Sequence, residues 1–469
     1  MRYTPLGAMK AVNQAFLRIP KEEIRRLLKR RAPLSLKHGM TMYTSQGTPR
    51  VISVQLRPWV IDAAQKRFFY KVCRTLRSAM ERVMPLYLSR PDVRRILPLE
   101  PEEHEWLMEA NAGGVQRPQA VLDRLDSTAT FARPDWRENF WFLEPNSVGI
   151  GGVHYIHATC DLTRDWVLPL LRKEVPGLRF SPPDDVRRLL FKMMQRHARA
   201  TGRKLRRVAL IEDQSVREGT DEFTAVARQF SLWGLPAVTA DPRDILLRRG
   251  ELTVKGKPVN MFYRDTEITE MIEMAGGKAV RLDGMKQAFI RNQVVSSIAG
   301  EFDHKSAWEL FTNPEFSRYF TGPQKRLFRE HVLWTRLLWE RRTTDPKGRN
   351  IELLPYARRN RENLVLKPNR LYGGEGVVFG HLTGQSVWER HLARAARRPY
   401  THVVQQAVRV HAELFPEASP QGEVSLEPYY AVTGFAATSD GMAVLGRSSK
   451  EAVVNVSRKG GLIAIWQMG

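Results

Sequence analysis

The sequence is poor in cysteine and has neither a long apolar run nor a low-complexity segment. Cys73 and Cys160 are the only cysteines among 469 residues. Two cysteines cannot form a disulfide framework and are typical of a reducing compartment. No apolar run is long enough to span a membrane, and the N-terminus lacks the apolar stretch and small-residue cleavage site of an export signal. These absences predict a cytoplasmic protein.

Acidic residues are in deficit, because 74 Lys and Arg face 50 Asp and Glu, a formal net charge of +24. A basic surface attracts nucleic acid, anionic membranes or acidic substrates. Here the basic residues are spread along the whole chain, which is equally typical of an ordinary solvated surface. No zinc-finger spacing, aromatic RNA-recognition motif or basic zipper occurs. The sequence therefore disfavours nucleic acid as a partner, and an acidic partner or substrate stays an alternative.

Hydrophobic periodicity divides the chain into regions of different character. The first 130 residues are mainly helical in pattern, and from Asp62 to Arg90 the apolar residues recur every three or four positions, which predicts an amphipathic helix. After Arg206, a strand, a helix ending at Gly234 and two further strands predict a small parallel α/β unit. Beyond residue 300, helices precede several short strands. The whole pattern predicts an α+β fold of two or three lobes.

The segment NLVLKPNRLYGGEGVVFG, residues 363–380, is the sharpest local signal. Lys367 ends an apolar strand, and Gly373, Gly374 and Gly376 follow in the turn before the next strand. Glycines let backbone N–H groups approach phosphate oxygens closely, and a lysine adds positive charge. The alternative is an ordinary hairpin with an exposed lysine. The Walker and protein-kinase patterns do not fit, because in both the lysine follows the glycines.

Other motifs accompany this segment in a fixed order. ARPDW supplies Arg133 and Asp135, and FLEPNSVGIGG supplies Glu144, Asn146 and a small-residue turn starting at Ser147. FYRD, HKSAWELF, VVQQAV and the C-terminal AVLGRSSKEAVVNVSRKGG follow. Together these motifs resemble the circularly permuted branch of the ATP-grasp superfamily, which includes eukaryotic glutathione synthetase and bacterial glutathionylspermidine synthetase. The likeness spans residues 130–469.

The resemblance implies an ATP- and Mg²⁺-dependent, ADP-forming carboxylate–amine ligase that makes an amide or peptide bond on an amino acid, peptide or natural-product substrate. It also implies a circularly permuted ATP-grasp fold with four parts: a mainly helical region (1–130), a metal- and substrate-binding part of the core (131–204), a small α/β substrate domain (205–300) and an ATP-binding lobe (301–469).

The resemblance also assigns roles to individual residues. The catalytic arginines are Arg133 and Arg447. The ATP-binding residues are Lys305, Lys367, Gly373, Gly374, Gly376, Gln405 and Gln406, and the substrate-binding residues are Asp135, Ser147, Tyr263, Arg264 and Asn455. The metal ligands are Glu144, Asn146 and Glu375, with Asn369 as an alternative to Glu375. Glu144 and Asn146 lie two apart in a predicted strand, so their side chains are expected on one face.

Alternatives remain at this stage. His154, His157 and Cys160 suggest zinc, but no fourth ligand completes the site. The chain could instead be an inactive nucleotide-binding scaffold, or a basic protein that binds an anionic partner such as nucleic acid.

Overall fold

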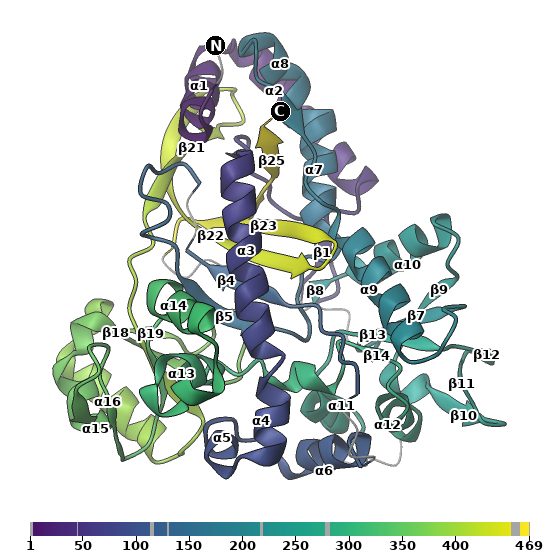
Figure 1. Ribbon diagram of the computed structural model, residues 1–469. Coiled ribbons are helices and arrows are strands. Elements are labelled where there is room, and N and C mark those ends of the chain that lie inside the picture. The colour runs from purple at the N-terminus through teal and green to yellow at the C-terminus, as the bar shows by residue number, and fades with distance from the viewer. Residues whose placement is uncertain are drawn as a thin grey trace.

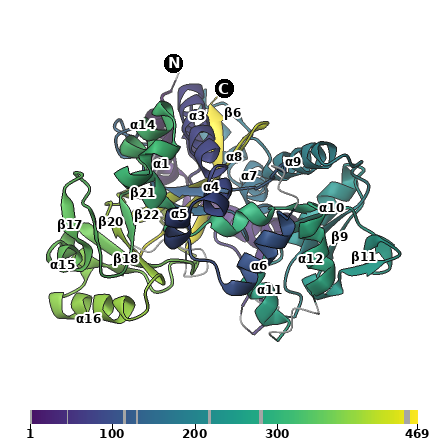
Figure 2. The ribbon, with the colours of Figure 1, turned by 60° about the horizontal axis from the view of Figure 1, so that its bottom comes forward.

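The computed structural model describes residues 3–44, 46–112, 117–128, 131–215, 219–276, 282–451 and 460–468 (Figures 1 and 2). The α-helices are α1 (Pro5–Arg18), α2 (Lys21–Lys37), α3 (Ala63–Met80), α4 (Val83–Ser89), α5 (Pro91–Ile96), α6 (Pro101–Ala110), α7 (Tyr155–Trp166), α8 (Leu168–Glu174), α9 (Val186–Ala200), α10 (Glu222–Leu232), α11 (Ile268–Met274), α12 (Asp283–Ile290), α13 (Ala307–Thr312), α14 (Gly322–His331), α15 (Leu353–Arg359) and α16 (Gln385–Ala396). The 3₁₀ turns include η1 (Pro242–Asp244), η3 (Ile298–Phe302), η4 (Pro314–Tyr319), η5 (Arg361–Asn363) and η6 (Gly380–Leu382).

The strands follow the same order along the chain. They are β1 (Thr41–Tyr43), β2 (Pro49–Val51), β3 (Trp59–Ile61), β4 (Arg124–Ser127), β5 (Phe142–Asn146), β6 (Phe180–Ser181), β7 (Val208–Ile211), β8 (Gly219–Thr220), β9 (Ala237–Ala240), β10 (Leu246–Arg248), β11 (Glu251–Val254), β12 (Lys257–Pro258), β13 (Met261–Arg264), β14 (Val294–Val295), β15 (Thr335–Leu337), β16 (Arg342–Thr344), β17 (Asn350–Glu352), β18 (Leu364–Pro368), β19 (Val378–Phe379), β20 (His402–Gln406), β21 (Ala412–Ala418), β22 (Val424–Thr438), β23 (Gly441–Ser449), β24 (Gly461–Ile463) and β25 (Ile465–Met468).

A central antiparallel sheet has the order β24-β23-β22-β4-β5, with β21 paired to β22. The long helix α3 crosses one face of it (Figure 1), where Phe69 stacks on Phe435 with 5.0 Å between ring centroids. Asp62 begins α3 with a reciprocal capping box to Gln65, which satisfies two backbone N–H groups at its start. The amphipathic helix predicted from Asp62 onward is therefore confirmed, although it ends at Met80 and a separate helix, α4, follows.

The small α/β unit contains a parallel sheet of order β14-β13-β7-β9. Helix α10 connects β7 to β9, and Gly234 takes a φ of 84° just beyond its end, a backbone conformation that favours glycine. The predicted strand–helix–strand order is confirmed. The β10-β11-β12 meander between β9 and β13 was not predicted.

A second antiparallel sheet, β15-β20-β18-β19, belongs to the C-terminal lobe. Leu364 and Leu366 of β18 pack with Trp388 of α16 in a hydrophobic core separate from the main one. Because side chains alternate along a strand, Lys367 then lies on the opposite face of β18 from Leu366. The core thus orients the lysine away from α16.

The region before residue 130 is not wholly helical. Strand β4 belongs to the central sheet, where it pairs with β5, and β1 pairs with both β2 and β8. The two ends of the chain lie at the same end of the molecule (Figures 1 and 2). Among the helices within the described ranges, none has the length and apolar character required to cross a membrane.

Candidate active site

A cavity of about 380 Å³ lies between the central sheet and the C-terminal lobe. Its walls come from β4, β5, β22 and β23 on one side and from β18, β20 and the glycine loop on the other. Strand β1 and Ile52, from the N-terminal region, also line it, together with the loop before α7, the first residues of α7 and α10, and β24. The lining residues are Met42, Ile52, Arg124, Asp126, Leu143, Glu144, Asn146, Gly149, Gly151, Gly152, Tyr155, Glu222, Leu333, Val365, Lys367, Tyr372, Gly373, Gly374, Val377, Phe379, Gln405, Gln406, Val408, Val410, Val432, Leu445, Arg447 and Leu462.

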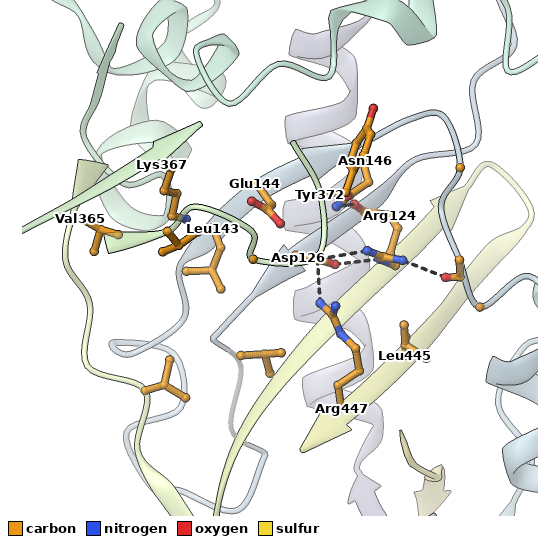
Figure 3. Close-up of a pocket in the computed structure, with 18 of the residues that line it drawn as sticks. Arg124, Asp126, Leu143, Glu144, Asn146, Val365, Lys367, Tyr372, Leu445 and Arg447 are labelled. Atoms are coloured by element: carbon orange, nitrogen blue, oxygen red, sulfur yellow. Dashed lines mark hydrogen bonds and ion pairs between the residues drawn. The ribbon is translucent and has the colours of Figure 1, made fainter. Parts of the chain in front are cut away.

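Charged side chains of β4 and β5 share the face of the sheet that borders this cavity. Arg124 pairs in register with Asn146, and Asp126 with Glu144, so all four side chains lie on one side. Asp126 accepts hydrogen bonds from Arg124 Nε at 2.8 Å and from Arg447 Nη2 at 2.7 Å. Figure 3 shows Asp126 between Glu144 and Arg447. One buried carboxylate therefore orients two arginines toward the same space.

Glycine at position 434 makes this arrangement possible. Gly434 lies on β22 opposite Asp126. A Cβ atom built there would be 2.8 Å from Arg124 Cγ and Cδ and from Asp126 Oδ1, closer than real contacts allow. The absence of a side chain at this position leaves room for the arginine to lie flat across the sheet.

Two lysines border Glu144 from the C-terminal lobe. Lys305 Nζ lies 3.5 Å from Glu144 Oε2 and donates a hydrogen bond to the carbonyl of Leu371 at 2.7 Å. Burial alone would raise the pKa of Glu144, but Lys305 and Lys367 outweigh it and lower that pKa. Burial lowers the pKa of Lys367, and Glu144 partly opposes this effect. Two cations around one carboxylate leave positive charge for a ligand to neutralise.

Glu144 and Asn146 are the residues best suited to hold Mg²⁺, which prefers oxygen ligands and typically takes one or two protein carboxylates. Asn146 uses its Nδ2 in a bond to the carbonyl of Arg124 at 3.1 Å, and its amide oxygen takes no part in that bond. Glu375 is exposed in the glycine loop and is not among the lining residues. Asn369, the alternative, uses its Oδ1 to accept a bond from the backbone N–H of Ser306 at 2.9 Å.

The glycine loop after β18 contributes Tyr372, Gly373 and Gly374 to the wall. Gly373, Gly374 and Gly376 have φ values of 66°, 73° and 66°, the left-handed region that favours glycine. At Gly376 a Cβ atom would also lie 2.8 Å from Pro368 Cγ. The loop thus needs glycine for its conformation and, at one position, for space.

Gln405 and Gln406 end strand β20 beside apolar side chains of the cavity. Gln405 Nε2 donates to the carbonyl of Leu143 at 3.1 Å and to Thr335 Oγ1 at 2.9 Å, so this amide ties β20 to β5 and β15. The backbone N–H of Gln406 bonds to the carbonyl of Trp334 at 2.8 Å. Around them lie Leu143, Leu333, Val365, Phe379, Val408 and Val410. This end of the cavity suits a flat apolar ring with polar edges.

Several residues assigned by the resemblance lie outside the lining. Arg133 and Asp135 pair with each other at 2.6 Å and are partly exposed. Ser147 donates its hydroxyl hydrogen to Asp123 at 2.7 Å. Tyr263 is buried in β13, and Asn455 is outside the described residues.

Arg264 is fully buried and forms an ion pair with Glu301. It also donates to the carbonyl of Ser296 at 2.8 Å. This arginine joins segments of the small α/β unit and does not line the cavity.

Sequence reasoning missed Arg124 and Asp126. They form a second Arg-x-Asp pattern upstream of Arg133, and the polar–apolar–polar order of Arg124, Leu125 and Asp126 is typical of a half-buried strand. That alternation could have distinguished the two patterns. No local signal identifies Met42 or Glu222, which reach the cavity from distant parts of the chain.

The residues considered for zinc have other roles. His154 Nε2 contacts the carbonyl of His38 at 3.0 Å, and Cys160 contacts the carbonyl of Ile465 at 3.5 Å. Burial raises the pKa of the Cys160 thiol to about 12. Within the described ranges, the His, Cys, Asp and Glu side chains that approach one another as metal ligands would are Glu103, Glu267 and Glu301, remote from these residues in the sequence.

Comparison with known proteins finds a solved structure with a similar fold and no related sequence family. No protein-family model matches the chain, and no curated protein sequence does. Among solved structures, the chain is similar to a glutathione synthetase-like effector from Globodera pallida in its apo form, with a TM-score of 0.66, 10% sequence identity, and coverage of 96% of this chain and 99% of that one. At this identity the likeness shows the fold alone, a mixed α and β fold like that of the effector.

Proposed function

We propose that the protein is an ATP- and Mg²⁺-dependent, ADP-forming carboxylate–amine ligase with a circularly permuted ATP-grasp fold. The observation that carries this proposal is the convergence of Lys367, Glu144 and Arg447 on one cavity, from β18, β5 and β23. A lysine, an acidic oxygen ligand and an arginine are the groups that phosphoryl transfer to a carboxylate requires. The fold of the neighbouring structure supports the proposal at the level of architecture.

The proposed reaction has two chemical steps. In the first, a carboxylate oxygen of the acid attacks the γ-phosphorus of ATP, and the bond from that phosphorus to the β–γ bridging oxygen breaks, releasing ADP. In the second, the amine nitrogen attacks the carbonyl carbon of the acyl phosphate. The carbon–oxygen bond to phosphate then breaks, and the amine loses a proton.

The residues of the protein would position the substrates and neutralise their charges. Lys305 and Lys367 would bind phosphate oxygens, and the apolar ring of residues around Gln405 and Gln406 would bind adenine. Arg447, oriented by Asp126, would bind the acid and stabilise the acyl phosphate, since arginine pairs well with carboxylates and phosphates. Glu144 and Asn146 would hold Mg²⁺, which neutralises phosphate charge when bound.

The test is untargeted mass spectrometry of a small-molecule cell extract incubated with ATP, Mg²⁺ and the pure protein. We expect ADP and a new ion with the mass of two extract components minus water. Both signals should be absent with Glu144→Ala and present with Glu389→Ala, a change at an exposed position of α16. Nucleotide binding without ADP release in any extract would instead favour an inactive scaffold.

A further inference from the structure

The cavity continues beyond the charged cluster into an apolar end. Five aliphatic side chains line this end: Met42, Ile52, Val432, Leu445 and Leu462. Met42 and Ile52 come from the N-terminal region, whose role the sequence did not indicate. They reach the central sheet because Ser53 O accepts a hydrogen bond from the backbone N–H of Leu462 at 2.8 Å, which joins the segment after β2 to β24.

These aliphatic side chains surround Arg447. Val432 of β22 and Leu462 of β24 both pair in register with Arg447 of β23, so the three side chains share a face. Leu445 lies two residues before Arg447 and therefore on that face as well (Figure 3). The guanidinium thus projects from an apolar surface, and a Cβ atom built at Gly152 would lie 3.4 Å from Leu445 Cδ2.

The other charged groups at this end are already paired within the protein. Asp126 bonds to Arg124 and Arg447. Glu222 accepts from the backbone N–H groups of Gly152 at 2.5 Å, His154 at 2.6 Å and Tyr155 at 3.1 Å. Neither carboxylate is available to bind an ammonium group of a substrate.

Arg447 differs from these groups, because its Nε is buried and finds no hydrogen-bond partner among the described residues. A buried N–H without a partner is unfavourable, and a small rotation of the guanidinium, which borders the cavity, would bring this group to an oxygen of a bound carboxylate. The apolar end therefore offers one donor for a carboxylate and aliphatic contacts for whatever is attached to it.

We propose that the acid substrate has an uncharged, apolar body next to its carboxylate, and that Met42, Val432, Leu445 and Leu462 select it. This inference rests on the proposed ligase function. Burial of an aliphatic side chain excludes a charged one of similar shape, because the latter would lose its hydration without gaining a partner. The preference should amount to about 10- to 100-fold in kcat/KM, the range of hydrophobic-pocket discrimination.

Three acids of nearly equal shape test this preference: N-acetylleucine, N-acetylasparagine and N-acetylaspartate. Hydroxylamine serves as the amine for all three. Its nitrogen attacks the acyl phosphate carbon, the bond to phosphate breaks, and the hydroxamate is measured together with ADP. Binding of each acid is measured separately by calorimetry in the presence of ADP and Mg²⁺.

Variants locate the preference in the structure. Leu445→Asn and Met42→Gln should each reduce the leucine-to-asparagine ratio of kcat/KM by about tenfold. Met42 is half-buried, so the second variant is expected to fold even if the first does not. Leu232→Asn, at an exposed position at the end of α10, is the matched control and should leave the ratio unchanged.

The possible outcomes distinguish the apolar preference from the ligase function. A higher kcat/KM for N-acetylleucine that falls in both cavity variants supports the inference. Efficient hydroxamate formation from N-acetylaspartate overturns the apolar preference but keeps the ligase. Selective binding of N-acetylleucine without ADP release keeps the apolar preference and overturns the ligase, and neither binding nor turnover overturns both.

Discussion

Two clusters of buried charge each include one residue from the segment before the glycine loop, and they differ in the groups that pair with their charges. The open cluster comprises Arg124, Asp126, Glu144, Lys367 and Arg447, which line the cavity, and Lys305, which lies behind Glu144 and outside the lining. The closed cluster comprises Glu103, Glu267, Glu301, Arg264 and Arg370. Arg370 directly precedes the loop, and Lys367 lies three residues earlier, so one short segment contributes to both clusters.

The closed cluster is completed by its own arginines. Arg370 donates two hydrogen bonds to Glu103, at 2.7 and 2.6 Å, and one to Glu267 at 2.7 Å, while Arg264 pairs with Glu301. The three glutamates approach one another as closely as metal ligands do, but the guanidinium of Arg370 already binds two of them. Because these residues come from α6, β13, the start of α11, η3 and the loop after β18, the cluster joins five segments of the chain.

The open cluster has charge that the protein leaves without a partner. Arg447 Nε has no hydrogen-bond partner among the described residues, and two lysines face one glutamate. Buried ion pairs stabilise a fold only when their geometry and hydrogen bonds are complete. The difference indicates that the closed cluster maintains the architecture, whereas the open cluster is suited to an anionic ligand.

The largest effect expected from this comparison is on stability, in Arg370→Met. Glu103 and Glu267 would lose the guanidinium that binds both of them, and removing one partner from a buried charged network costs about 3–5 kcal/mol. Denaturant unfolding measures the loss. Arg318→Met removes the ion pair of an exposed arginine with Asp92 and should change stability by less than about 1 kcal/mol. Equal effects of the two variants would contradict the structural role of the closed cluster.

Glu144→Gln, in contrast, should lower turnover strongly and change stability little. Loss of the metal-binding carboxylate should lower ADP formation about 100- to 1,000-fold, the size of losing one preorganised electrostatic contact. Stability should change by about 1 kcal/mol or less, because the site borders a cavity that water and ions can enter. Turnover and unfolding are measured on the same sample, with Glu389→Gln as the control. A large stability loss with normal turnover would show that Glu144 maintains the fold and is not needed for the reaction.

Gly434→Ala should give an intermediate effect on both properties. The added methyl group would displace Arg124 or Asp126, and overpacking of this kind costs about 1–3 kcal/mol. Turnover should fall with it, because Asp126 orients Arg447. Gly322→Ala is the control, since a Cβ atom there meets nothing within 4 Å. Full activity in Gly434→Ala would show that the arginines tolerate a shift.

Local patterns in the sequence predicted the strands and the loop that carry the open cluster, but they did not identify all of its residues. The strand ending at Lys367, the glycine loop and the pair Glu144 and Asn146 follow from spacing and alternation. Arg124 and Asp126 could have been recognised by the same alternation, although Arg133 and Asp135 match the same short motif. The pairing of β4 with β22 and β5 places the first pair in the central sheet.

The closed cluster and the apolar end were beyond sequence reasoning for a different reason. Glu103, Glu267 and Arg370 are more than a hundred residues apart along the chain, and nothing local marks them as partners. Met42 likewise reaches the cavity through the pairing of β1 with β2 and β8. Long-range pairing of short strands depends on tertiary packing, which one sequence does not disclose.

The smallest expected effect is the pH dependence of the unfolding free energy, which should have opposite signs for the two clusters. Burial raises the pKa of Glu267 and of Glu301 to about 8, with help from Asp303 for Glu267 and from Glu103 for Glu301. The folded closed cluster therefore holds protons that the unfolded chain releases, so its contribution to stability is present at low pH and is lost as pH rises toward about 8.

Glu267→Gln should remove part of this dependence while keeping an oxygen acceptor for Arg370. The fall in unfolding free energy between pH 6 and 8 should shrink by about 1–2 kcal/mol, because one such group contributes up to about 1.4 kcal/mol per pH unit. Glu144→Gln is the comparison: the lysines lower the pKa of Glu144, so its contribution is lost only in acid, and the slope between pH 6 and 8 should stay as in the unaltered protein. Denaturant unfolding at a series of pH values measures both slopes. If the two variants changed the slope equally, the pH dependence of stability between pH 6 and 8 could not be assigned to the closed cluster. Only the geometry of their hydrogen bonds and ion pairs would then distinguish the two clusters.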